Sequence, residues 1–153
     1  MIWLKNFAKL DESELAEVYA ARSDKGLLAF WGAPSVSFAE FKNIAKSADK
    51  TRFAVFDEDD FFGVIEFGNI SAQGAELSFY KNPKIPRVGN TLMKEAVRYA
   101  SQNLGLKFLT ATVDKNNRKA RSLLTRSGFV ENGGTDQISM KKFITKVENE
   151  KQI

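Results

Sequence analysis

Residues 80–92 combine a loop, a helix start and positive charges, which together could bind an anion. The pattern predicts a strand that ends near Lys81 and a helix that begins near Gly89, and the first amides of a helix have no intrahelical partners. Such amides bind phosphate groups, and a glycine allows the phosphate oxygens to approach closely. Lys84 and Arg87 would add positive charge, and the amide donors would come from Val88, Gly89, Asn90 and Thr91. A single glycine at this place can also be an ordinary turn residue, so both interpretations stay open.

The composition excludes several other kinds of site. The 153 residues contain no Cys and no His, which leaves no thiolate nucleophile, no disulfide, no Ser-His-Asp relay and no Cys/His zinc site. The loop at 84–89 lacks the Gly-Lys-Ser/Thr ending of nucleotide hydrolases. No long apolar run and no secretion leader is visible, so we expect a cytoplasmic protein with no membrane partner and no metal.

Positive charge is concentrated in one part of the chain. Residues 81–126 contain eleven Lys and Arg residues and two acidic ones, a net charge of +9, while the rest of the chain carries −5. This segment predicts a polyanionic partner, either nucleic acid or a phosphorylated small molecule, although it can also be one solvated helix face. We do not expect nucleic acid, because no groove-reading helix or aromatic RNA motif accompanies the charge.

The elements that would position these residues follow from the periodicity of the apolar side chains. Residues 1–153 are predicted to form one α/β (α+β) domain, a mixed central β-sheet with helices on both faces. Two capping boxes, Asp11 with Glu14 and Ser37 with Glu40, predict the first two helices. Two further helices follow Gly89 and residue 117, and the polar tail after 145 is expected to fray. Strands are predicted at 3–7, 52–56, 61–70, 75–81, 107–113 and 137–143.

The predicted helix at 117–127 carries the motif of a known family. The segment resembles the Asn-x-x-Ala-x-x-x-Tyr-x-x-x-Gly-Phe helix of the GNAT superfamily of acyl-CoA N-acyltransferases. Leu124 stands where the tyrosine usually does. The residues that match are Asn117, Ala120, Gly128 and Phe129.

The loop upstream is similar to the same family's pyrophosphate loop, Arg/Gln-x-x-Gly-x-Gly/Ala. Lys84 stands at the first position, Arg87 replaces the first glycine and Gly89 is the last residue. The resemblance covers residues 50–143, and it implies that the basic segment binds the phosphates of the cosubstrate acetyl-CoA.

The resemblance also implies how the rest of the cosubstrate is held. In this family the strand at 75–81 diverges from the strand at 107–113, so that the free amides of Phe79, Tyr80 and Lys81 pair with the pantetheine arm and polarise the thioester oxygen. Asn117 would reach the same arm, although an asparagine there can also be only a helix cap. Transfer would be direct, without a covalent enzyme intermediate.

Two carboxylates are candidates for accepting the proton of the attacking amine. Glu66 lies among Val64, Ile65 and Phe67 on a strand that would face the cleft, and it could accept the proton directly or through water. Glu76 is the second candidate. Each could instead be a carboxylate on the solvent face of its strand.

The leucine at 124 removes the hydroxyl that the family motif would use to protonate the departing thiolate. Tyr80, Ser78 or water would have to supply that proton, or transfer would be slow. Tyr80 could instead stack on a substrate or pack in the core.

Residues 62–67, 78–83 and 116–120 are most similar, within the superfamily, to the flagellin-modification acetyltransferases of the pseudaminic acid pathway. That likeness implies a nucleotide-linked 4-amino-deoxy sugar as the acceptor. Arg22 could pair with its diphosphate and Phe30 or Trp31 could cover the base or the sugar, although these residues could equally be structural. Peptide N-acetylation and a degenerate domain that only binds CoA are the alternatives, and a homodimer is compatible with the sequence.

Overall fold

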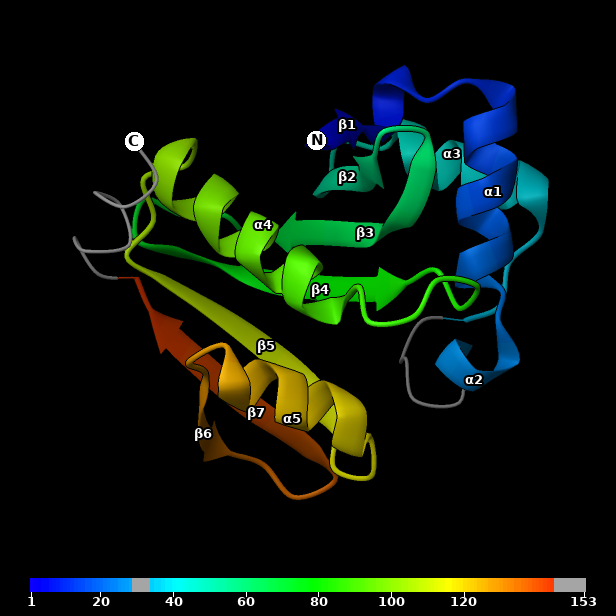
Figure 1. The fold of residues 1–153 in the computed structure, drawn as a ribbon. Helices are drawn as coiled ribbons and strands as arrows, with labels where there is room; N and C mark the ends of the chain where they lie inside the picture. Colours follow the sequence, from blue (N-terminus) through cyan, green and yellow to red (C-terminus); the bar gives the residue numbers. More distant parts are fainter. Residues whose placement is uncertain (29–33, 145–153) are drawn as a thin grey trace.

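A mixed β-sheet forms the centre of the computed structural model, which describes residues 1–28 and 34–144. Figure 1 shows helices packed against both faces of this sheet, which confirms the predicted architecture. In chain order the strands are β1 (Ile2–Asn6), β2 (Thr51–Asp57), β3 (Asp60–Gly68), β4 (Gly74–Lys81), β5 (Phe108–Asp114), β6 (Val130–Gly133) and β7 (Gln137–Phe143). The helices are the 3-10 turn η1 (Phe7–Lys9), α1 (Glu12–Arg22), α2 (Lys25–Leu28), α3 (Phe38–Lys46), α4 (Gly89–Gln102) and α5 (Arg118–Arg126).

The spatial order of the strands is β1-β2-β3-β4-β5-β7-β6. Every neighbouring pair is antiparallel except β4 and β5, which run parallel. The parallel pairing is short, since it joins Gly74–Glu76 to Phe108–Thr110 and then stops. Beyond these pairs the two strands diverge, as the family resemblance implied, and the sheet is open in its middle.

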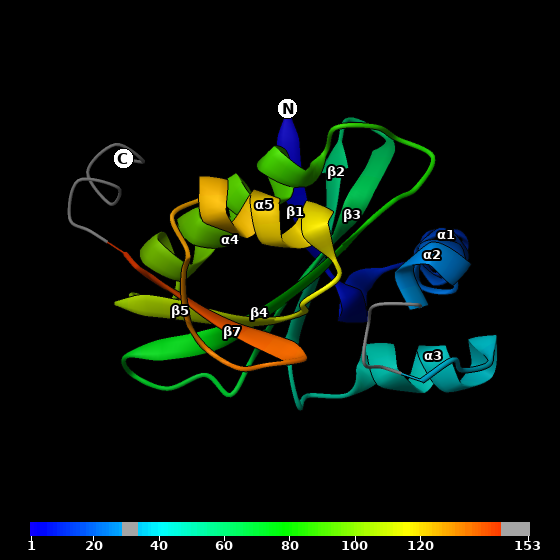
Figure 2. The ribbon, with the colours of Figure 1, turned by 90° about the horizontal axis from the view of Figure 1, so that it is seen from below.

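Two apolar cores lie on opposite faces of the sheet. Helices α4 and α5 cover one face, where Leu92, Met93 and Leu124 pack on alternate side chains of β2–β5 and β7. Helices α1 and α3 cover the other, where Val18 and Phe41 pack on the intervening side chains of β2–β4. Figure 2 shows α4 and α5 well apart from α1 and α3.

The helix starts are set by local side-chain contacts. Both predicted capping boxes are present, with Asp11 and Ser37 each accepting a hydrogen bond from the third residue of its helix. Asn117 caps α5 by accepting from the amide of Ala120 at 3.2 Å. The start of α4 differs, because Val88 offers no side-chain cap.

Several predicted boundaries were wrong. The first strand ends at Asn6 because the Asn6 side chain accepts from the Ala8 amide and starts η1. The third strand ends at Gly68, where Asn69 turns the chain with a φ of +47°. Strand β6 was not predicted, since its four residues are all exposed and carry no apolar alternation. In the described residues no helix is both long and apolar enough to cross a membrane.

Candidate active site

The opening between β4 and β5 exposes backbone groups in the middle of the sheet. The amide of Asn82 donates to the carbonyl of Phe62 at 2.9 Å, so Asn82 continues the antiparallel ladder between β4 and β3. Because residues of an antiparallel strand point their backbone groups to alternate sides, the amides of Phe79 and Lys81 point away from β3 and into the opening. The described part of β5 does not pair with them. These two amides are therefore available to a ligand.

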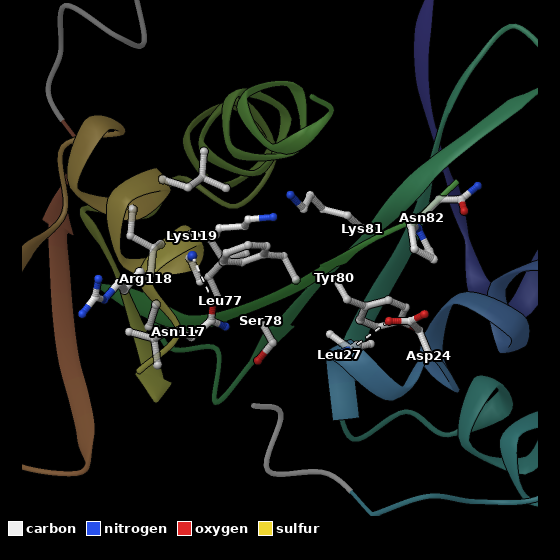
Figure 3. A pocket seen from close by; sticks show the side chains of 18 of the residues that line it. Asp24, Leu27, Leu77, Ser78, Tyr80, Lys81, Asn82, Asn117, Arg118 and Lys119 are labelled. Carbon is white, nitrogen blue, oxygen red and sulfur yellow. Dashed lines mark hydrogen bonds between the residues drawn. The ribbon is translucent and has the colours of Figure 1, made fainter. Parts of the chain in front are cut away.

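A pocket of about 790 Å³ occupies this opening. Its walls come from Leu77–Asn82, from residues 111–113 of β5, from the loop that follows β4, from the first turns of α5, and from Asp24, Gly26 and Leu27 (Figure 3). All three predicted residues of β4, Phe79, Tyr80 and Lys81, line it, and so does Ser78. The pocket is therefore shared between both faces of the sheet.

The pocket is rich in positive charge. Arg118 and Lys119 at the start of α5, Arg87 in the loop and Lys81 on β4 all contribute to its lining. Within 1–28 and 34–144, none of these four forms an ion pair. By contrast, their neighbour Arg121 is paired with Glu131 at 2.6 Å. The positive charge of these four side chains is thus not neutralised by an ion pair within the described chain.

The loop between β4 and α4 is held by Asn82, a residue for which the sequence predicted no role. Asn82 is buried, its Nδ2 donates to the carbonyl of Phe61 at 2.9 Å, and its Oδ1 accepts from the amide of Lys84 at 3.1 Å. Arg87 in this loop has a φ of +62°, a left-handed conformation that favours glycine. The arginine therefore stands in a backbone conformation that suits the glycine of the family motif.

The first turn of α4 presents free amides beside the pocket. The amide of Leu92 bonds to the carbonyl of Val88 at 3.0 Å, which leaves those of Gly89, Asn90 and Thr91 without intrahelical partners. The structure gives Gly89 a further reason to be glycine, because a Cβ there would lie 2.9 Å from Leu123 Cδ2. The predicted residues Lys84, Val88, Gly89, Asn90 and Thr91 lie next to the lining rather than in it.

Asn117 was predicted to cap a helix and to reach the pantetheine arm, and the structure shows the cap. Its side chain caps α5, and the residue also lines the pocket. Leu124 lines the same wall, 1% exposed, so this position provides an apolar contact where the family motif has a hydroxyl.

Glu66 is buried but does not line the pocket. Its sequence neighbours suggested an apolar environment, whereas the structure shows a charged partner. The carboxylate is 5% exposed and accepts from Arg52 Nε at 3.0 Å, while Arg52 Nη1 donates to Asp49 Oδ1 at 3.0 Å. The reason is cross-strand pairing, since Arg52 on β2 stands opposite Glu66 on β3. On its other side Glu66 stands opposite Ser78, which does line the pocket.

Tyr80 points to the same face of the sheet as Glu66. Burial raises the pKa of the Tyr80 phenol well above its usual value, and the nearby Glu66 carboxylate raises it further. Tyr80 therefore keeps its proton at neutral pH, so that it can donate a hydrogen bond but cannot act as a base.

The remaining candidates are not brought into the pocket. Glu76 is exposed and accepts from Asn69 Nδ2 at 2.8 Å. Arg22 is 6% exposed, does not line the pocket, and donates from Nη1 to the carbonyl of Pro34 at 3.2 Å. Trp31 and Phe30 lie outside the described residues. Sequence reasoning missed Asp24, which lines the pocket but belongs to no motif and carries only the signal of a residue that precedes a short helix.

Comparison with known proteins places the chain in a family. A family model described as an acetyltransferase (GNAT) domain matches residues 6–130. A curated relative, acetyltransferase PseH of Campylobacter jejuni subsp. jejuni serotype O:23/36 (strain 81-176), is 34% identical over 133 residues, which cover 84% of this chain and 85% of the relative. The crystal structure of Campylobacter jejuni N-acetyltransferase PseH in complex with acetyl coenzyme A aligns with a TM-score of 0.80 and 29% identity, over 95% of this chain and 100% of that one.

A more distant structure shares the fold alone. Spermidine N-acetyltransferase from Vibrio cholerae, in complex with CoA and spermine, aligns with a TM-score of 0.80 at 21% identity, over 97% of this chain and 98% of that one. The family model covers most of the chain, and the divergent β4 and β5, the uncapped start of α4 and the Asn117 cap lie within its span. The chain belongs to the GNAT acetyltransferase family.

Proposed function

We propose that this enzyme transfers the acetyl group of acetyl-CoA to the primary amine of a nucleotide-linked 4-amino-deoxy sugar, a precursor of a flagellin glycan. The observation that carries the transfer is the opening between β4 and β5, with the amides of Phe79 and Lys81 on one wall and four cations in the lining. The choice of acceptor rests on the resemblance to flagellin-modification acetyltransferases and on the relatives named PseH, 33–34% identical over 84% of the chain.

The pocket residues fit the chemical groups of acetyl-CoA. Its phosphates would be held by Arg87, Arg118 and Lys119 together with the free amides of α4, because a helix start and guanidinium groups both favour phosphate. Lys84 would add charge at longer range. The amides of the pantetheine arm would pair with the backbone of Phe79 and Lys81, as an added strand does at a sheet edge.

The transfer itself needs orientation and a path for one proton. The amine nitrogen forms a bond to the acetyl carbon while the carbon–sulfur bond breaks, and the amides of Phe79 and Lys81 stabilise the charge that develops on the oxygen. Holding both substrates in this geometry supplies about 7–11 kcal/mol of the barrier. The proton of the amine would pass through water and the Ser78 hydroxyl to Glu66. Water would protonate the thiolate, because the raised pKa of Tyr80 makes its phenol a poor acid.

Two measurements test this function. Calorimetry with acetyl-CoA is expected to show binding by the purified protein, and absence of binding would end the proposal.

A competition assay with labelled acetyl-CoA would then offer a UDP-linked 4-amino sugar together with a panel of free-amine peptides. Labelling of the sugar nucleotide is expected. Labelling of the peptides alone would overturn the acceptor and favour peptide N-acetylation.

The same assay separates an enzyme from a degenerate domain, because a protein that binds acetyl-CoA but labels no amine would be the latter. The single domain, the cytoplasmic location and a homodimer stay predictions.

A further inference from the structure

The pocket is polarised by charge. Its cations, Lys81, Arg87, Arg118 and Lys119, come from β4, the following loop and α5. Among the described residues that line it, Asp24 is the one carboxylate. Figure 3 shows Arg118 and Lys119 on the opposite side of the pocket from Asp24. A ligand that crosses the pocket therefore meets positive charge at one end and negative charge at the other.

The Asp24 carboxylate is held in place but not neutralised. Its Oδ2 accepts from the amide of Leu27 at 3.1 Å, which fixes the carboxylate at the start of α2. No Lys or Arg within 1–28 and 34–144 forms an ion pair with it. Only one lone pair is committed to the cap, so the carboxylate can accept further hydrogen bonds.

The surroundings of Asp24 suit one end of a small polar molecule. Leu27 and Tyr80 line the same part of the pocket and supply apolar walls. The side chains of Ser78 and Tyr80 point to the face of the sheet covered by α1 and α3, so Asp24, which follows α1 and precedes α2, approaches the β4 edge from this face. The cationic start of α5 lies with the helices of the opposite face. An acetyl group held by the β4 amides would thus have the phosphate end of its carrier on one side and Asp24 on the other.

We propose that Asp24 binds the acceptor amine in its protonated, ammonium form and so selects cationic acceptors. This inference rests on the proposed acetyl transfer and names the residue that recognises its second substrate. A primary amine arrives from neutral water mainly as ammonium, and a carboxylate with a free lone pair is its natural partner. Any phosphate on the acceptor must then lie away from Asp24, because like charges repel.

The test compares the same substitution at two aspartates that cap helices, Asp24 and Asp11. Asp24→Asn removes the charge but leaves an amide oxygen that can still cap Leu27, since Asn and Asp are equally good at this position. Asp11→Asn is the matched control, because Asp11 is also a capping aspartate but is exposed and outside the pocket. The probe is the amine that the unmodified protein acetylates most rapidly in the competition panel described above.

At pH 7 we expect Asp24→Asn to raise the KM for the amine about tenfold or more, the usual size of a lost charged hydrogen bond, while the calorimetric Kd for acetyl-CoA stays within about twofold. The KM ratio between variant and unmodified protein should shrink above the pKa of the acceptor amine. An analogue with hydroxyl in place of the amine should inhibit both proteins equally.

Three results would overturn the inference: an amine KM equal to that of Asp11→Asn, a KM ratio independent of pH, or weaker inhibition of the variant by the hydroxyl analogue. Failure of the proposed function gives a different result, because the unmodified protein would then acetylate no amine. That result would overturn both the proposed acetyl transfer and the role of Asp24.

Discussion

In the proposed reaction Glu66 would accept a proton from the pocket through a neighbour, because Glu66 is buried and does not itself line the pocket. Ser78 stands directly opposite it on β4 and lines the pocket, so its hydroxyl or a water at this point would complete the proposed path. Arg52 binds the same carboxylate, so Glu66 also holds β2 against β3. Glu66 thus has a structural role and, in the proposed reaction, a chemical one as well, and a mutation must separate the two.

Glu66→Gln is expected to lower kcat by about 10² or more at saturating substrates, because the amide cannot accept the proton. Glu76→Gln is the matched control on the neighbouring strand, since Glu76 is exposed and outside the pocket, and it should leave kcat within about twofold. Thermal unfolding of both variants shows whether the loss of the charge pair with Arg52 has unfolded the protein. A folded Glu66→Gln variant with unchanged kcat would leave Glu66 only the structural role.

A hydroxyl added at position 124 tests how the departing CoA thiolate is protonated. Leu124→Tyr restores the tyrosine of the family motif, and Leu124→Phe controls for the larger ring, which would cost about 1–3 kcal/mol in this packed core. If departure of the thiolate limits turnover, kcat of the Tyr variant should exceed that of the Phe variant by roughly tenfold or more. Equal kcat values would mean that the present chain already protonates the thiolate by another route.

At the scale of elements, the loop from Asn82 to Val88 and the start of α4 determine how phosphate could be bound. Asn82 anchors one end of this loop to β3, and the other end continues into α4, where Gly89 lies close to Leu123 of α5. The loop is therefore fixed at both ends before a ligand arrives. A fixed site loses less conformational entropy on binding.

We expect Arg87 to lower the stability of the fold and to raise the affinity for acetyl-CoA. A non-glycine residue in the left-handed region is less stable by about 1–2 kcal/mol. Arg87→Gly relieves this strain and Arg87→Ala keeps it, so the Gly variant should be the more stable of the two by about 1 kcal/mol in urea unfolding, after the larger entropy of glycine in the unfolded chain. Both variants should bind acetyl-CoA about tenfold more weakly, because both lose the guanidinium. Unchanged affinity would show that this guanidinium does not reach the phosphates.

Gly89 separates steric from electrostatic effects at the start of α4. Gly89→Ala places a Cβ against Leu123, the flexible end of a side chain that can shift, and should weaken acetyl-CoA binding only slightly. Gly89→Asp adds a carboxylate beside the phosphates and should weaken binding by well over tenfold. Calorimetry on both variants gives the comparison. Equal losses would mean that this helix start binds no phosphate.

The elements that the sequence predicted well are those set by neighbouring residues. Capping boxes at Asp11 and Ser37, the periodicity of α4 and the alternation of β2–β5 are local, and the family motif marked the loop between β4 and α4. The partner of Glu66 was not predictable, because Arg52 meets it only through strand pairing. Asp24 reaches the pocket through the packing of α1 on the sheet, which no local pattern records.

At the scale of the whole molecule, the positive and negative charges lie on different elements of the fold. The positive segment 81–126 includes β5, α4 and α5, while the rest of the chain is net negative. Such a distribution attracts anions to one side of the molecule, and salt weakens the attraction.

Binding of CoA should therefore depend on ionic strength. Raising NaCl from 50 to 500 mM is expected to weaken CoA binding by roughly tenfold, while acetyl-pantetheine, which has no phosphate, should change by less than about twofold. Calorimetry or competition with labelled acetyl-CoA measures both ligands under the same conditions. Equal salt dependence of the two would assign the affinity to the pantetheine contacts alone.

The divergence of β4 from β5 gives this sheet two inner edges in addition to the outer edges on β1 and β6. Unpaired edges are templates for strand addition and aggregation, and most proteins shorten, charge or cover them. Here the pairing of Gly74–Glu76 with Phe108–Thr110 closes one end, and α5 and residues 24–27 flank the opening on either face. A polypeptide strand in this opening would need room for its side chains on both faces of the sheet. An unbranched chain with amide groups, such as the pantetheine arm, needs no such room. The same geometry that admits such a ligand therefore protects an interior edge against self-association.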